Sequence, residues 1–275
     1  MKFALKQFVM TDTKRWKRAA ERIVRQRLDL TPIEALSPRS RPQDEAQGYA
    51  LQVEVNRLLS KSGLGRVVGH KIGCTTSVMQ AFLGIPNPCA GDVFAETVRH
   101  GHATLPRSGF VKLGIECEIA VELGRNVFPT DGPFTRDTIA PAVHAVMAAM
   151  EIVDDRYRNY GELGVPTLIG DDFFDSGCVL GEPLVEWREL DLTALSGVTL
   201  INGKEVGRGT GGLIMGHPFD ALAWLARSRA ARGMGLKQGE FVLLGSVVET
   251  KWLDAGDNAR IEIDTLGDVG IRVTG

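Results

Sequence analysis

The chain has 275 residues, a length that suits one large domain or two small ones. Lysine and arginine number 32 and aspartate and glutamate number 34, so the formal net charge of −2 argues against a protein that binds nucleic acid through bulk positive charge. The 44% of hydrophobic residues argues against intrinsic disorder, and the absence of any apolar run of ~20 residues argues against a helix that spans a bilayer.

The start of the chain shows no secretory signal, because Lys6 follows the short apolar opening at once. The basic segment 14–27 raises the possibility of a mitochondrial presequence, but it contains Glu21 and no serine, which favours an exposed amphipathic helix. The cysteines show neither C-x-x-C spacing nor a disulfide framework, and this favours buried thiols in a reducing compartment: Cys74, Cys89, Cys117 and Cys178. We therefore expect a cytoplasmic protein.

Hydrophobic periodicity predicts two helices in the first part of the chain, over residues 14–29 and 43–62. A loop rich in proline and serine separates them, and Gly63 and Gly65 end the second helix. The glycine-framed segment 65–73 then predicts a short buried strand.

Strand patterns dominate from residue 105 onwards. Residues 113–123 alternate between the two faces of a strand, with apolar side chains on one face and mostly glutamates on the other. A helix is predicted over 138–149, and a strand starts at 150–153. Further apolar runs predict strands at 178–180, 197–201, 241–248, 259–263 and 269–273.

Two local signals organise this second part. Asn202-Gly203 is typical of a hairpin turn, and Pro218 suits the first turn of a helix over 218–231. Because helices come first and mostly strands follow, the order favours a mixed α+β architecture over a regular βαβ alternation.

The feature with the most chemical content is the pair Glu116 and Glu118 on the alternating strand. Residues two apart on a strand point to the same side and lie about 7 Å from each other. On a solvated face this pair carries no function, whereas in a cavity a cation is the natural way to keep both carboxylates ionised. Glu151 is a third candidate ligand, with Asp154 and Asp155 just beyond it, and such a set selects Mg²⁺ or Mn²⁺.

Two glycine-rich segments are weaker candidates. Residues 207–212 lack the Lys-Ser/Thr ending of a P-loop, so we interpret them as a tight backbone turn that borders a pocket. Gly216-His217-Pro218 lies at a helix start, where free N–H groups bind anions, although a histidine beside a helix cap is more often structural. No Gly-x-Ser-x-Gly motif is present, which argues against a serine hydrolase.

Five sequence blocks follow one another in a fixed order: GHKIGCT at Gly69–Thr75, IECEIA at Ile115–Ala120, MEIV at Met150–Val153, LIMGHP at Leu213–Pro218 and ALAWLA at Ala221–Ala226. Together they resemble the 2-keto-4-pentenoate hydratases of the fumarylacetoacetate hydrolase superfamily, which are close in sequence to the 4-oxalocrotonate decarboxylases. The similarity extends from near Arg15 to the C-terminus.

The resemblance implies a fumarylacetoacetate-hydrolase-like α+β fold, in which a mixed β-sheet roll carries an N-terminal helical region. It divides the chain into a helical region with a pocket-lining strand over 1–104 and a catalytic β-roll over 105–275, packed as one compact unit. It also implies a homo-oligomer and a small-molecule 2-oxo acid substrate, with no nucleic-acid or membrane partner.

For the site, the resemblance implies that Lys71 lies in the pocket near the substrate. Glu96 stands where the family usually has aspartate, and the extra methylene moves its charge by ~1.5 Å, which leaves its catalytic role open. Ser246 and His217 are expected to contact the substrate. The implied ligands of a Mg²⁺ or Mn²⁺ ion are Glu116, Glu118 and Glu151.

Two segments depart from the family pattern. Residues 170–176 read GDDFFDS where the family often has Asp-Asn-Ala-Ser, and residues 244–250 read LGSVVET in place of a Thr/Ser-Gly-Ala-Leu-Gly pocket strand. Both departures are expected near the substrate, so they suggest an acyl portion that differs from the simplest pentenoate.

The implied chemistry starts from a 2-oxo acid whose oxygens chelate a divalent ion, which stabilises the enolate. In a 2-hydroxy-2,4-dienoate, water then adds at C4, as in the degradation of aromatic compounds. The same enolate serves decarboxylation of a 2-oxo-3-enedioate or C–C hydrolysis of an acylpyruvate, so these outcomes stay open. A non-enzymatic binding or assembly homologue is the remaining alternative, and the intact Lys71 and glutamates count against it.

Overall fold

The computed structural model describes residues 16–275. The start of the chain, where no secretory signal is expected, and the first two residues of the helix predicted over 14–29 lie outside the described residues. Within them, this first helix spans 16–28. Among residues 16–275, no helix combines the length and the apolar character that a membrane crossing requires.

The later helices are α2 (Glu45–Leu59), α3 (Ser77–Leu83), α4 (Arg136–Ile139), α5 (Tyr160–Leu163), α6 (Val165–Gly170) and α7 (Pro218–Ala231). The strands are β1 (Val67–Gly73), β2 (Cys89–Phe94), β3 (Val98–His100), β4 (His102–Pro106), β5 (Leu113–Leu123), β6 (Val143–Asp154), β7 (Asp175–Leu180), β8 (Ser196–Ile201), β9 (Lys204–Thr210), β10 (Phe241–Trp252), β11 (Asn258–Ile263) and β12 (Gly267–Thr274).

Local signals explain several element boundaries. The Asp44 side chain accepts a hydrogen bond from the N–H of Gln47 and so caps α2. Gly63 has a φ of 105° in the helical turn that follows α2, a conformation that glycine adopts without strain. Asn202 and Gly203 both have positive φ, as the predicted hairpin between β8 and β9 requires.

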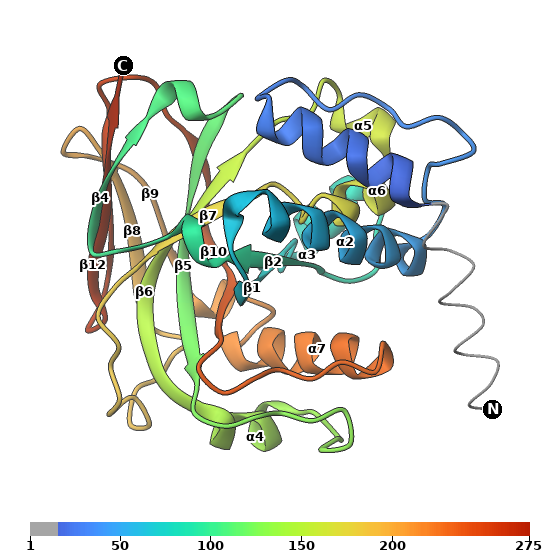
Figure 1. Ribbon diagram of the computed structural model, residues 1–275. Helices are drawn as coiled ribbons and strands as arrows, with labels where there is room; N and C mark the ends of the chain where they lie inside the picture. Colours follow the sequence, from blue (N-terminus) through green and yellow to red (C-terminus); the bar gives the residue numbers. More distant parts are fainter. Residues whose placement is uncertain (1–15) are drawn as a thin grey trace.

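The strands form two mixed sheets. One has seven strands in the order β2-β1-β10-β5-β6-β7-β3, and the other has five in the order β4-β12-β11-β8-β9. Figure 1 shows the five-stranded sheet on one side of the long strands β5 and β6 and the helices gathered on the other side. The predicted α+β class with a helical N-terminal region is confirmed. β1, β2 and β3, which precede residue 104, belong to the seven-stranded sheet, and β4, which spans residue 104, belongs to the five-stranded sheet.

The helix predicted over 138–149 is wrong. α4 ends at Ile139, and β6 runs through the same segment as a central strand between β5 and β7. From Ala145 to Asp154 its side chains are buried on both faces, so no polar alternation marks it as a strand. Its alanines and methionines favour a helix when only the local sequence is considered.

The turn predicted over 207–212 is wrong for most of its length, because β9 extends to Thr210. Its glycines allow close packing on β10: a Cβ at Gly209 would come within 1.8 Å of the Val247 carbonyl oxygen. Only the short 3₁₀ turn Gly211–Leu213 remains as a turn.

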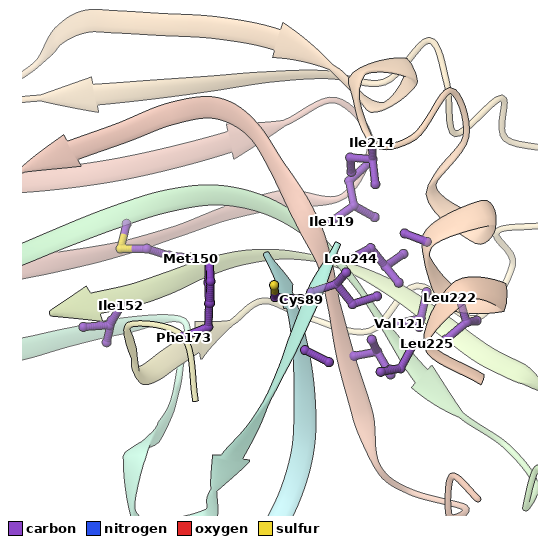
Figure 2. Packing of buried hydrophobic residues seen from close by; sticks show 14 of the residues in the cluster. Cys89, Ile119, Val121, Met150, Ile152, Phe173, Ile214, Leu222, Leu225 and Leu244 are labelled. Carbon is purple, nitrogen blue, oxygen red and sulfur yellow. The ribbon is translucent and has the colours of Figure 1, made fainter. Parts of the chain in front are cut away.

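Helix α7 covers one face of the seven-stranded sheet. Its Leu222 and Leu225 are fully buried and point towards Val121 of β5 and Leu244 of β10 (Figure 2). Because odd-numbered residues of β5 face this apolar layer, the even-numbered glutamates of β5 are placed on the opposite side of the strand.

Candidate active site

The register of two neighbouring strands brings three glutamates together. Glu116 and Glu118 lie two residues apart on β5, so their side chains point to the same side. Glu151 of β6 pairs directly with Glu116 in the antiparallel ladder, which puts Glu151 on that side too. One carboxylate oxygen from each residue lies within 4.8 Å of the other two. We call this set the glutamate cluster (Glu116, Glu118, Glu151).

The surroundings of the glutamate cluster leave carboxylate oxygens free for a cation. A β10 bulge at Gly245, with a φ of 127°, aims its N–H at Glu118 and donates to Oε2 at 2.9 Å. The Thr250 hydroxyl donates to Oε1 of Glu116. The fully buried Glu118 Oε1 and Glu151 Oε2 have no hydrogen-bond donor. Since unsatisfied buried oxygens are costly, this donor set fits a divalent ion.

Burial also disfavours negative charge on the glutamate cluster. It raises the pKa of Glu118 well above its ordinary value, and the carboxylates of Glu151 and Glu116 raise it further. Burial raises the pKa of Glu151 to about 8, although the ammonium of Lys71 opposes this shift. When no further cation is bound, protons on the carboxyl groups therefore reduce the negative charge of the glutamate cluster. A divalent ion has to displace these protons when it binds.

Lys71 reaches the glutamate cluster from β1. Its Nζ lies 2.9 Å from Oε1 of Glu151 and donates to the carbonyl oxygen of Phe173 at 2.9 Å. Burial opposes the charge on Lys71, but Glu151 and Glu116 outweigh burial and raise the pKa above its ordinary value. A Cβ at Gly73 would lie 2.9 Å from the Phe173 ring, so the glycine leaves room for this arrangement.

A cavity of about 540 Å³ opens beside these groups. Lys71, Glu116 and Ser246 line it, so the structure brings together three residues that the sequence assigns to one site. Glu118 and Glu151 lie behind the wall, fully buried. The Ser246 hydroxyl donates to the carbonyl oxygen of Val248, so it can offer only its lone pairs to a bound molecule.

Two predicted site residues lie elsewhere. Glu96 is exposed in a short turn after β2 and is not among the described residues that line the cavity. His217 is absent from that lining as well: its Nδ1 accepts a hydrogen bond from the N–H of Phe219 at 3.0 Å and caps α7. Burial lowers the pKa of His217, in keeping with a neutral acceptor. The structure therefore brings neither side chain to the cavity.

The acids just beyond Glu151 have separate roles. The Asp154 carboxylate accepts hydrogen bonds from the backbone N–H groups of Val111 at 3.3 Å and Lys112 at 2.7 Å, so it organises the loop before β5. Asp155 lines the cavity and forms an ion pair with Lys112 at 3.4 Å.

The segment 170–176 reaches the cavity, as the sequence predicts, and it contains an arrangement of side chains that the sequence did not specify. The rings of Phe173 and Phe174 line the cavity. The flanking acids are fully buried and lie within 3.5 Å of Arg27, and we call them the aspartate cluster (Asp171, Asp172, Asp175). Two adjacent phenylalanines among three aspartates are an unusual signal in a loop, but Arg27 is too far away in sequence to be identified as their partner.

Comparisons with known proteins identify the family of this chain. Residues 89–274 match the family described as fumarylacetoacetate (FAA) hydrolase, C-terminal. The chain is 33% identical to a 2-keto-4-pentenoate hydratase of Burkholderia vietnamiensis, over 84% of this chain and 87% of the relative. It is 31% identical to a 4-oxalocrotonate decarboxylase of a Pseudomonas species, over 92% of this chain and 97% of the relative.

One solved structure with the same fold is the 4-oxalocrotonate decarboxylase from Pseudomonas putida G7, complexed with magnesium and adipate. The TM-score is 0.88 at 25% identity, and the match covers 95% of this chain and 98% of that one. The resemblance that the five sequence blocks indicate is thereby confirmed.

Proposed function

Because the chain belongs to the fumarylacetoacetate hydrolase family, we propose that it is a divalent-metal-dependent hydratase that adds water to a 2-hydroxy-2,4-dienoate in the degradation of aromatic compounds. The observation that carries the proposal is the glutamate cluster beside Lys71 at a cavity of about 540 Å³. A hydratase relative at 33% identity supports the reaction type.

The glutamate cluster would hold Mg²⁺ or Mn²⁺, since it offers carboxylate oxygens only. When bound, such an ion supplies Lewis-acid stabilisation of negative charge on the substrate's oxygen atoms. The Gly245 N–H and the Thr250 hydroxyl fix the orientation of two of the carboxylates, and so they preorganise the site.

Lys71 binds the carboxylate of the 2-oxo acid. Its raised pKa keeps the ammonium protonated at neutral pH, so it acts as a charge partner or a proton donor and not as a resting general base. The bond to the Phe173 carbonyl and the contact with Glu151 hold its Nζ in place. The Phe173 ring beside Nζ, with its centroid 5.4 Å away, limits access of water to the ammonium.

The second candidate is decarboxylation of a 2-oxo-3-enedioate, which the relationship to the decarboxylases favours. Both reactions need the same glutamate cluster, so the cluster does not separate them. C–C hydrolysis of an acylpyruvate is the third outcome of the same chemistry.

The test follows the loss of absorbance of 2-hydroxypenta-2,4-dienoate with and without Mg²⁺, and the release of CO₂ from 2-oxo-3-hexenedioate. We expect Mg²⁺-dependent loss of the dienoate with all carbon atoms retained, and both EDTA treatment and Glu118→Gln should strongly lower the rate of this loss. Release of CO₂ as the faster reaction would assign the decarboxylase function. A folded protein that turns over neither substrate would leave C–C hydrolysis of an acylpyruvate, or a binding or assembly role.

We further propose a homo-oligomer located in the cytoplasm. Family membership supports the oligomer, and the four free cysteines, of which Cys89, Cys117 and Cys178 are buried, fit a reducing compartment. Light scattering at micromolar concentration should report a particle larger than one chain, and a particle of one chain's mass would contradict the assembly.

A further inference from the structure

A large part of the cavity lining is apolar. Its lining includes Val78, Met79, Tyr160, Phe174, Leu213 and Trp252. Among the described residues, nine large hydrophobic side chains are exposed, and four of them line this cavity. Exposed apolar groups that gather around one opening, and are not scattered singly, mark a place where an apolar ligand binds.

Apart from Lys71, the ionisable side chains that we find in the cavity lining are acidic. Among described residues, the ionised groups that line it are Lys71 and the acids Glu116, Asp155 and Glu249. Lys71 already faces Glu151. The two lysines near the acids of the rim are occupied: Lys112 pairs with Asp155 at 3.4 Å, and Lys251 pairs with Glu249 at 2.6 Å. A second carboxylate on the substrate would therefore meet acids and no free cation of the lining.

The aromatic part of the wall is built on a constrained turn. Asp172, Phe173 and Phe174 have φ values of 57°, 50° and 69°, and three consecutive left-handed residues without glycine are costly. The surrounding contacts enforce the conformation: the N–H of Phe173 donates to Leu168 O at 2.8 Å, and Arg27 donates to Asp175 O at 2.8 Å. The rings are consequently held in fixed positions.

This turn links Lys71 to the aromatic side chains of the cavity wall. The carbonyl of Phe173 holds Nζ of Lys71, while the ring of Phe174 packs edge-on against Phe173 and Tyr160, with centroid distances of 5.5 and 6.0 Å. A 2-oxo acid whose carboxylate lies at Lys71 would thus extend its distal end along an aromatic and aliphatic surface.

We infer that the cavity selects 2-hydroxydienoates whose distal end is uncharged and apolar, and that it rejects those ending in a second carboxylate. The inference rests on the proposed function, since it specifies the substrate class of the same site. Val78, Met79 and Phe174 are the residues that determine this specificity.

A binding measurement tests the inference without turnover. The probes are 2-oxohexanoate and 2-oxoadipate, which have the same chain length and differ in a terminal methyl or carboxylate group. Their affinities are measured by calorimetry on the full chain saturated with Mg²⁺. We expect 2-oxohexanoate to bind at least about tenfold more tightly, because a desolvated carboxylate without a partner is disfavoured. Equal or tighter binding of 2-oxoadipate would overturn the inference.

A matched pair of variants locates the effect. Val78 and Val53 are both exposed valines on helices, but only Val78 lines the cavity. Val78→Lys supplies the missing cation and should reduce the preference for 2-oxohexanoate by about three- to fivefold, as expected for a partly exposed ion pair. Val53→Lys should leave the preference unchanged. The same change in both variants, or in neither, would contradict the role of Val78.

Failure of the inference and failure of the proposed function give different results. If 2-oxoadipate binds as well as 2-oxohexanoate and the dienoate is still hydrated, only the inference falls. If Mg²⁺ binds and neither 2-oxo acid does, the proposed function falls and the inference falls with it.

Discussion

The glutamate cluster lies on β5 and β6, whereas the aspartate cluster lies in the turn before β7 and at the start of β7, and different groups balance the charge of the two sets. In the glutamate cluster, Lys71 is the cation in direct contact, at 2.9 Å from Glu151. In the aspartate cluster, Arg156 lies 2.8 Å from Asp171, Arg27 reaches all three carboxylates within 3.5 Å, and the Tyr157 hydroxyl donates to Asp171 at 2.8 Å.

The two clusters also differ in the hydrogen bonds that their carboxylate oxygens accept. Asp172 Oδ1 accepts hydrogen bonds from Asn56 at 3.0 Å and from the N–H of Asp92 at 3.0 Å. By contrast, Glu118 Oε1 and Glu151 Oε2 have no donor. In the aspartate cluster, Oδ2 of Asp172 also lacks a hydrogen-bond donor, but it lies 3.5 Å from the guanidinium of Arg27. Protein groups thus balance the aspartate cluster, which holds the turn at Phe173 and Phe174, whereas the glutamate cluster needs a cation from outside the chain.

The comparison is tested most strongly by removing one acid from the glutamate cluster. Glu118→Gln should lower kcat/KM by ~10²- to 10⁴-fold, because the several kcal/mol of Lewis-acid stabilisation are lost. The melting temperature without metal should not fall, since burial and the neighbouring carboxylates already disfavour the charge on Glu118. Glu122→Gln, on the same strand, is the control and should leave both quantities unchanged. A lower melting temperature without metal would show that the carboxylate is structural.

In the aspartate cluster, by contrast, we expect removal of a charged partner to lower the stability of the fold. Arg156→Met leaves Asp171 buried without its closest cation and should lower the free energy of unfolding by about 3–5 kcal/mol. Arg158→Met is the control, because Arg158 is exposed and pairs with Glu34 at the surface, and it should cost about 0–1 kcal/mol. Urea denaturation of both variants measures the difference. Equal stabilities would mean that the aspartate cluster does not depend on its arginine.

Lys71→Met tests whether the charge of Lys71 is needed for activity in a chain that still folds. Loss of one charge-assisted contact of ~2–3 kcal/mol corresponds to about a 30- to 150-fold decrease in kcat/KM, and to more if Lys71 also moves a proton. The methionine retains the stem, and Glu151 can take up a proton when it loses the ammonium, because its pKa is already raised to about 8, so the variant should remain folded. Its melting temperature is the control. Steady-state kinetics on a 2-hydroxydienoate gives the answer, and near-normal activity in a folded variant would remove Lys71 from the mechanism.

The smallest effect that we expect is the pH dependence of the stability of the fold. The pKa of Glu151 is about 8 in the fold, so between the ordinary glutamate value and that pH the folded chain binds more protons than the unfolded chain. Stability without metal should therefore fall as pH rises through this window. Metal binding releases these protons, so the increase in melting temperature caused by Mg²⁺ should be larger near pH ~8.5 than near pH ~6. An increase that does not depend on pH would contradict the raised pKa.

Part of this arrangement could be predicted from the sequence. The alternation along β5 places Glu116 and Glu118 on one side, because strand geometry has a period of two residues. The position of Glu151 opposite Glu116 could not be derived, since the sequence predicts a strand only from residue 150 and no local pattern gives the register of β6 on β5. The sequence offered Glu151 as a third ligand together with Asp154 and Asp155, and the family resemblance singled out Glu151 among them.

The remaining features depend on contacts between distant segments. Arg27 and Asp171 are 144 residues apart, and no local pattern pairs them. The left-handed backbone at Phe173 is imposed by its surroundings, against the preference of a bulky residue. His217 shows the converse: the structural role that its position at a helix start favours is the one the imidazole has, since it caps α7, whereas the substrate contact implied by the resemblance is not formed at the cavity.

The central claim is that the glutamate cluster, and not the aspartate cluster, binds a divalent ion. Anomalous diffraction from crystals of the full chain soaked in Mn²⁺ tests it directly. We predict one strong peak with an oxygen of Glu116, Glu118 and Glu151 each at ~2.0–2.2 Å from it, and no peak at the aspartate cluster. A peak among Asp171, Asp172 and Asp175, or none at the three glutamates, would contradict the account.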